Sequence, residues 1–202
     1  MIAARPESAR SEGRAPDLIQ EPIQVLFLDV DGVLADGGIW LAEGLELKRF
    51  AARDGAGAFL AHRAGLKLML VTFRESEAVK RRAAELGIEA LQGVREKGPA
   101  VQAALLRLHL PATAAAFMGD DLVDLEAMRS VGLAIAPRDA APAALRLADV
   151  VTSATGGQGA VREAIEILLW LNQSASERGS TTKATATTTR RGRGARAARR
   201  AG

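Results

Sequence analysis

The 202-residue chain contains no cysteine and no tyrosine, and only 3% of its residues are aromatic. Without cysteine it can form neither disulfides nor thiolate metal sites, so nothing in its chemistry ties it to an oxidising compartment. Its longest apolar runs, such as 25–28, are far shorter than the roughly 20 residues that a membrane-spanning helix requires. The first twenty residues mix Arg and Glu and lack the apolar run of a signal peptide. We therefore expect a soluble, cytoplasmic protein with no membrane contact.

The net charge of +3 is distributed unevenly along the chain. Residues 174–202 hold eight Lys or Arg against one Glu, whereas 22–173 carries a small net negative charge. Because 174–202 lacks large apolar side chains, we predict a disordered basic tail there, and we predict a flexible arm at 1–21. The remaining 22–173 has the usual size of one domain. Any contact with nucleic acid is expected only through the basic tail.

Short apolar runs alternate with longer helical patterns inside this domain, which is typical of an α/β fold with a doubly wound parallel sheet. A β-hairpin is predicted at 37–50, and its exposed apolar side chains indicate packing on another subunit. Right-handed crossovers bring the turns that follow the strands to one edge of the sheet. The predicted strands are 23–29, 66–72, 88–91, 114–118, 132–136 and 149–151, and the predicted helices are 56–64, 75–86, 96–108, 122–131, 142–147 and 159–171.

Acidic side chains follow two of the predicted strands. Asp29 and Asp31 end the first strand and, two residues apart on an extended segment, they point the same way. Asp120, Asp121 and Asp124 follow the strand at 114–118. Carboxylates gathered at one sheet edge repel one another unless a cation lies between them. Mg²⁺ prefers oxygen ligands, so these motifs predict a magnesium site.

Phosphoryl-binding groups lie between the two acidic motifs. Thr72 and Arg74 end the second strand, and Lys97 lies near the start of a helix. A hydroxyl, backbone N–H groups and a lysine are suited to hold the oxygens of a phosphoryl group. With a carboxylate nucleophile and a metal, they predict phosphoryl transfer through an aspartyl-phosphate. In this scheme Asp29 attacks phosphorus, and Asp31 protonates the leaving oxygen and later activates water.

The order of these motifs resembles that of the haloacid dehalogenase (HAD) superfamily of phosphatases. Within it, the chain is most similar to the 3-deoxy-D-manno-octulosonate 8-phosphate (KDO 8-phosphate) phosphatase family. The similarity is carried by Asp-Val-Asp-Gly-Val-Leu-Ala-Asp-Gly at 29–37, Arg53-Asp54-Gly55, Gly-Asp-Asp-Leu-Val-Asp at 119–124 and Gly-Gly-Gln-Gly-Ala-Val-Arg-Glu at 156–163. The resemblance implies a Rossmann-like HAD fold without a large cap domain, a hairpin flap after the first strand, and a homotetramer.

The resemblance also implies a role for each candidate residue. Asp29 would be the nucleophile and Asp31 the general acid and base. Mg²⁺ would be held by Asp29, the backbone carbonyl of Asp31, and Asp120, with Asp121 and Asp124 supporting these ligands. Thr72 and Lys97 would bind the phosphoryl group. The residues matching positions that line the family's substrate site are Arg53, Asp54, Gly55, Arg74 and Arg82.

One motif departs from the family pattern. Relatives usually have Thr-Gly-Arg in the second motif, whereas this chain has Thr72-Phe73-Arg74. Phe lacks the backbone freedom of Gly and places a ring near the substrate entrance. The implied activity is hydrolysis of the small sugar acid KDO 8-phosphate to KDO and phosphate during lipopolysaccharide-precursor synthesis. The alternatives are a phosphatase of a related nonulosonate 9-phosphate or another small sugar phosphate, and a catalytically degenerate HAD-like binding protein.

Overall fold

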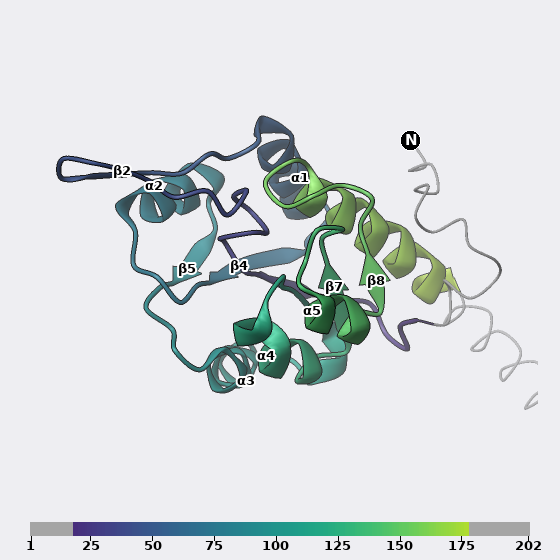
Figure 1. Cartoon of the computed structure of the whole chain (residues 1–202). Coiled ribbons are helices and arrows are strands. Elements are labelled where there is room, and N and C mark those ends of the chain that lie inside the picture. The colour runs from purple at the N-terminus through teal and green to yellow at the C-terminus, as the bar shows by residue number, and fades with distance from the viewer. Residues whose placement is uncertain (1–17, 178–202) are drawn as a thin grey trace, which may run out of the picture.

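The computed structural model describes residues 18–177. At its centre lies a six-stranded sheet in the order β5-β4-β1-β6-β7-β8, and every neighbouring pair is parallel (Figure 1). The α/β fold class predicted from the alternating sequence pattern is therefore confirmed. The strands are β1 (Val25–Leu28), β4 (Lys67–Val71), β5 (Glu89–Leu91), β6 (Ala115–Met118), β7 (Leu133–Ala136) and β8 (Val150–Val151).

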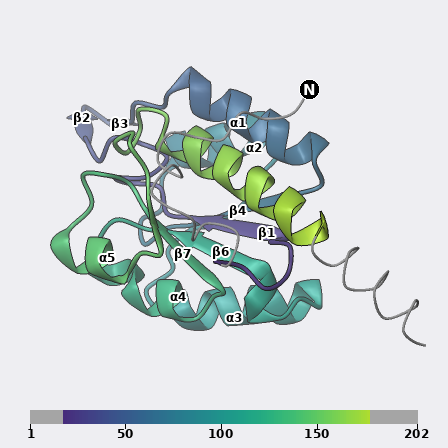
Figure 2. The same cartoon turned by 90° about the vertical axis from the view of Figure 1, so that its right-hand side faces the viewer.

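Helices cover both faces of the sheet (Figure 2). One face carries α1, α2 and a helix at 160–177 that has no label in the figures, and the other carries α3, α4 and α5. The labelled helices are α1 (Ala52–Arg63), α2 (Glu77–Leu86), α3 (Lys97–Leu108), α4 (Leu125–Arg129) and α5 (Pro142–Leu147), with single 3-10 turns at Ala112–Ala114 and Leu122–Asp124. Among the described residues, no helix is both long and apolar enough to cross a membrane.

The sheet separates two apolar cores. Side chains of β1 alternate between them, with Leu26 and Leu28 in the core beneath α1 and Val25 and Phe27 in the core above α3. All four positions of β1 are fully buried because helices cover both faces. A strand buried on both sides tolerates only apolar residues, which is why β1 was readable as a continuous apolar run in the sequence.

Helix α5 has the predicted bounds, whereas other helices begin or end at residues that differ from the prediction. Helix α1 begins at Ala52 rather than 56, so the candidate residues Arg53, Asp54 and Gly55 lie in its first turn. The predicted helix at 122–131 is instead a 3-10 turn followed by the short α4. The buried carboxylate of Asp124 accepts hydrogen bonds from the backbone N–H groups of Asp120 and Asp121, and these contacts favour the tight turn.

A two-stranded antiparallel hairpin lies between β1 and α1, formed by β2 (Trp40–Ala42) and β3 (Leu45–Leu47). Its tip contains Gly44, whose φ of 68° lies in the left-handed region that glycine adopts easily. The hairpin extends away from the sheet (Figure 1). Trp40 and Leu41 are 69% and 77% exposed. The apolar face expected from the sequence is therefore uncovered in the single chain.

Both predicted domain boundaries need correction. Ile19, placed in the flexible arm at 1–21, is buried in the core beneath α1, where an apolar side chain gains from leaving water. The last helix continues to residue 177, past the predicted start of the tail at 174, because Ala175 still packs on that core. The other residues of the predicted arm and tail, 1–17 and 178–202, lie outside the described residues.

Candidate active site

The first acidic motif begins where β1 ends. β1 pairs with β4 and β6 in a register that places Leu28 opposite Leu70 and Met118. The chain therefore leaves all three strands at the same edge, and the backbone N–H of Asp29 donates to Met118 O at 2.9 Å. Thr72 follows β4 and is buried, with its N–H bonded to Leu91 O. The strand register therefore brings the motifs together at this edge of the sheet, as the sequence predicts.

Three carboxylates meet at this edge. Asp29, Asp120 and Asp124 each offer an oxygen, and these oxygens lie within 4.8 Å of one another. Gly32 makes the approach possible: its φ is +95°, and a Cβ there would lie 2.1 Å from Asp120 Oδ2. Any side chain at this position would both strain the backbone and displace the Asp120 carboxylate.

Burial and neighbouring acids raise the pKa of Asp29 and of Asp120. Burial, followed by the charge of Asp124, raises the pKa of Asp29 to about 6, against the opposing effect of Lys97. Burial and the charges of Asp29 and Asp124 raise the pKa of Asp120 to about 8. Asp120 Oδ1 is also buried and has no hydrogen-bond partner among the described residues. A hard divalent cation would pair with this oxygen and neutralise the cluster, so the donor set fits Mg²⁺.

Lys97 links the nucleophile to the acidic cluster. Its buried Nζ donates to Asp29 Oδ1 and to Asp124 Oδ1, each at 2.6 Å. Burial opposes the charged ammonium, but the charges of Asp29 and Asp124 outweigh this effect and raise the pKa of Lys97. The lysine is thus held as a cation beside the carboxylate that would attack phosphorus. Its position at the first residue of α3 fixes that placement.

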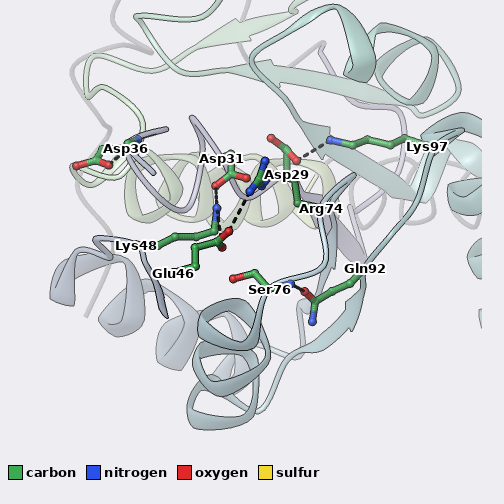
Figure 3. Close-up of polar contacts among 10 residues, drawn as sticks. Asp29, Asp31, Asp36, Glu46, Lys48, Arg74, Ser76, Gln92 and Lys97 are labelled. Atoms are coloured by element: carbon green, nitrogen blue, oxygen red, sulfur yellow. Dashed lines mark hydrogen bonds and ion pairs between the residues drawn. The ribbon is translucent and has the colours of Figure 1, made fainter. Parts of the chain in front are cut away.

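The side chain of Asp31 points toward Lys48, at the end of the hairpin (Figure 3), and it is not part of the three-carboxylate cluster. Its Oδ1 accepts a hydrogen bond from Lys48 Nζ, and Lys48 is also 3.5 Å from Glu46 Oε1. Glu46 Oε2 in turn accepts from Arg74 Nη2 at 2.9 Å. The neighbouring Ser76, followed by the hydrogen bond from Arg74, lowers the pKa of Glu46 to about 2. The predicted contact between the backbone carbonyl of Asp31 and Mg²⁺ stays a prediction.

The other two acids of the second motif have different environments. Asp121 is exposed and caps the 3-10 turn, accepting the N–H of Leu122 at 2.7 Å. Asp124 is fully buried and belongs to the carboxylate cluster itself. One of its oxygens lies within 4.8 Å of an oxygen of Asp29 and of Asp120. The role predicted for Asp121 and Asp124 is to support the residues that hold Mg²⁺, and this role stays a prediction.

The predicted substrate residues of α1 and α2 make contacts within the chain. Asp54 is buried and accepts the backbone N–H groups of Gly159 at 3.3 Å and Arg162 at 2.9 Å, at the start of the last helix. Arg82 donates to Ala51 O and Glu85 and lies 5.7 Å from the centroid of the Phe50 ring.

These contacts give Asp54 a structural role besides the predicted one. Each oxygen of its carboxylate accepts a backbone N–H at the start of the last helix, so Asp54 caps this helix, and its predicted substrate contact stays a prediction. Gly55 leaves room for Arg82, since a Cβ there would lie 2.9 Å from Arg82 Nη2. Arg53 and Arg74 remain exposed, with the Arg53 stem beside Gly159. Substrate contacts by Arg53, Gly55, Arg74 and Arg82 stay predictions.

Comparison with known proteins matches this chain to one family. Residues 88–165 match a family model described as haloacid dehalogenase-like hydrolase. The 3-deoxy-D-manno-octulosonate 8-phosphate phosphatase KdsC of Escherichia coli K12 is 43% identical over 151 residues, which cover 74% of this chain and 80% of that protein. The chain belongs to the KdsC family of HAD-like hydrolases.

Solved structures of KdsC-family proteins share the fold. A KDO 8-phosphate phosphatase of Moraxella catarrhalis, in complex with magnesium ion, phosphate ion and KDO, has a TM-score of 0.75 and 34% identity, covering 84% of this chain and 98% of that one. The cobalt-bound enzyme of Haemophilus influenzae has a TM-score of 0.73 and 34% identity, covering 78% and 93% of the two chains. The family resemblance stated from the motifs is confirmed.

The helix-capping contact of Asp54 in this KdsC-family chain predicts that its removal lowers stability. Asp54→Ala removes the acceptor of two backbone N–H groups at the start of the last helix. We expect it to lower the free energy of unfolding by about 1–3 kcal/mol, measured by urea denaturation. A purely structural role should leave the Michaelis constant of the folded protein within about twofold of wild type. A large rise in the Michaelis constant at unchanged stability would instead support the predicted substrate contact.

The sequence analysis missed Lys48 and Glu46. Along β3 and the residue after it, Glu46 and Lys48 share one face and Leu45 and Leu47 share the other, as strand alternation requires. The polar face of the hairpin lies on Asp31 and Arg74 (Figure 3). Two opposite charges at alternate positions directly after the first motif were the available signal.

Proposed function

We propose that this chain is a Mg²⁺-dependent phosphomonoesterase that hydrolyses KDO 8-phosphate to KDO and phosphate. The observation that carries the proposal is the joint placement of Asp29, Asp120 and Asp124 within 4.8 Å, with Lys97 Nζ 2.6 Å from Asp29. KdsC relatives carry this activity in their names, and the Moraxella catarrhalis structure holds magnesium, phosphate and KDO. Intact acids and Lys97 argue against a degenerate binding protein.

The chain's own residues divide the reaction into two steps. Asp29 attacks phosphorus, the bond from phosphorus to the sugar oxygen breaks, and Asp31 gives its proton to that oxygen. In the second step Asp31 takes a proton from water, which attacks the phosphoryl group on Asp29 and releases phosphate. Lys97 and Thr72 hold the phosphoryl oxygens. Asp29, Asp120 and the Asp31 carbonyl would hold Mg²⁺, with Asp121 and Asp124 in support, and the bound ion would supply positive charge that reduces the repulsion between the two anions.

The finer setting belongs to the same proposal. The uncovered Trp40 and Leu41 of the hairpin support assembly of the chain into a homotetramer. The product KDO places the reaction in lipopolysaccharide-precursor synthesis, which we locate in the cytoplasm. Arg53, Gly55, Arg74 and Arg82 supply a cationic lining that suits an anionic sugar acid. Contact with nucleic acid is confined to the basic tail, which lies outside the described residues.

A second substrate is favoured by one observation. Phe73 replaces the usual glycine beside Thr72, and its ring is 49% exposed at the edge where the motifs converge. A ring there narrows or reshapes the entrance for the sugar. The second candidate is therefore a nonulosonate 9-phosphate, which has a longer carbon chain and the same acid group.

The proposal is tested by measuring phosphate release from both sugar phosphates at saturating Mg²⁺. We expect kcat/KM for KDO 8-phosphate to exceed that for the nonulosonate 9-phosphate by about tenfold or more, since each poorly fitted group costs at least about 1 kcal/mol. The opposite ratio would favour the second candidate. Equal and weak rates on both substrates would reject both assignments.

A further inference from the structure

We propose that Lys48 is a positioning residue, which holds the Asp31 carboxylate in the orientation needed for proton transfer to and from the substrate. The inference rests on the proposed function, because it takes Asp31 as the acid and base of the two steps. It adds a residue from the hairpin to the site, although the four motifs contain no residue of this segment. The hairpin thereby contributes to the chemistry in its own chain.

The Lys48 side chain, directly after β3, has an exposed fraction of 0%. A buried ammonium is costly unless it is paired. Its carboxylate partners among the described residues are Asp31, through a hydrogen bond to Oδ1, and Glu46, whose Oε1 lies 3.5 Å away. One of the two carboxylates that offset the cost of burying this ammonium therefore belongs to the proposed catalytic acid.

The hairpin side of this contact is itself fixed. Glu46 receives a hydrogen bond from Arg74 at 2.9 Å, and Arg74 belongs to the segment that follows β4. Arg74, Glu46, Lys48 and Asp31 thus form an alternating row of positive and negative charges (Figure 3). The row joins the second motif to the first through the hairpin. Because the Lys48 ammonium is anchored on one side, it restricts the Asp31 side chain on the other.

Proton transfer needs this restriction. In the first step Asp31 gives its proton to the sugar oxygen as the bond from phosphorus to that oxygen breaks. A carboxyl group free to rotate meets the leaving oxygen in fewer of its conformations. The rate of this step should therefore fall for substrates whose leaving group is a strongly basic alkoxide. A nitrophenolate leaves without a proton, so its departure does not depend on where Asp31 points.

The experiment compares Lys48→Met with wild type on two kinds of substrate. For the sugar phosphate, we expect kcat to fall by about tenfold or more, part of the 10²–10⁴-fold that a general acid supplies. For p-nitrophenyl phosphate, we expect the rate of the nitrophenol burst, which reports attack by Asp29, to stay within about threefold. Equal losses on both substrates, or no loss on either, would overturn the proposal.

The matched control is Lys80→Met, the same substitution at a lysine of α2 whose side chain is 72% exposed. It should leave both rates within about twofold of wild type. If Lys48→Met fails to fold, the double variant Lys48→Met with Glu46→Gln removes the cation and its second acid together. It should show the same selective loss of kcat, and an equal loss on both substrates would again overturn the proposal.

The proposed function can fail separately from this inference. Wild type alone tests the substrate: if it does not release phosphate from KDO 8-phosphate, the proposed function fails. The role of Lys48 is then read on whichever alkyl phosphate wild type hydrolyses fastest, against the same nitrophenol burst. A selective loss there supports the inference whatever the natural sugar phosphate is.

Discussion

Asp29→Asn is expected to abolish phosphate release while leaving the protein folded. An amide cannot attack phosphorus to form the aspartyl-phosphate, so kcat should fall by at least about a thousandfold. The fold should survive because Asn keeps an oxygen that can accept the hydrogen bond from Lys97 Nζ. Phosphate release from KDO 8-phosphate measures the first effect, and urea denaturation measures the second.

The pH dependence of stability provides the control for Asp29→Asn. The pKa of Asp29 is raised from 3.8 to about 6 in the folded chain. The folded state therefore holds this proton longer than the unfolded state, and the metal-free wild type loses stability as pH rises from about 4 to about 6. The variant lacks this loss, so above pH 6 its free energy of unfolding should equal or exceed that of wild type. Residual wild-type activity in a folded variant would refute the mechanism.

Removal of divalent cations is expected to have the second large effect. Treatment with EDTA should lower phosphate release by at least about a hundredfold, because the buried carboxylates are left without a neutralising charge. Added Mg²⁺ should restore the rate. Full activity in EDTA would contradict the proposal that Asp29 and Asp120 hold a metal ion.

Binding of Mg²⁺ can be measured independently of phosphatase activity. The pKa of Asp120 is raised from 3.8 to about 8 by burial and by its acidic neighbours, so the metal-free protein should also lose stability as pH rises through this range. At pH 8, Mg²⁺ should therefore raise the thermal midpoint of wild type. Asp120→Asn should reduce that rise, since it removes the carboxylate whose Oδ1 has no hydrogen-bond partner within residues 18–177. An equal rise in wild type and variant would exclude Asp120 as a ligand.

The strands and the residues directly after them were predictable because their causes are local. A strand buried on both faces has to be apolar throughout, and β1 is the clearest case. The chain has to turn where that run ends, at Asp29. Parallel pairing then brings Thr72 and Gly119 to the same edge as Asp29, whatever the details of the loops.

The roles of residues within helices and the hairpin were less predictable. Asp54 lies in a motif shared with the family, yet its carboxylate bonds Gly159, which is 105 residues away in the sequence. Nothing local distinguishes a carboxylate that caps a distant helix from one that faces a ligand. The same holds for Lys48, whose partner Asp31 is 17 residues earlier and across a turn.

The sequence by itself determined the α/β fold, the four motifs and the acids at the ends of β1 and β6, because apolar periodicity and chain turns are local properties. Its lack of cysteine left carboxylates as the available strong metal ligands beside histidine. Only the tertiary structure decided which carboxylates meet. It brought Asp124 into the cluster with Asp29 and Asp120, turned Asp31 toward Lys48, and assigned Asp54 to a helix end. Side-chain partners depend on packing between distant segments, which no local pattern records.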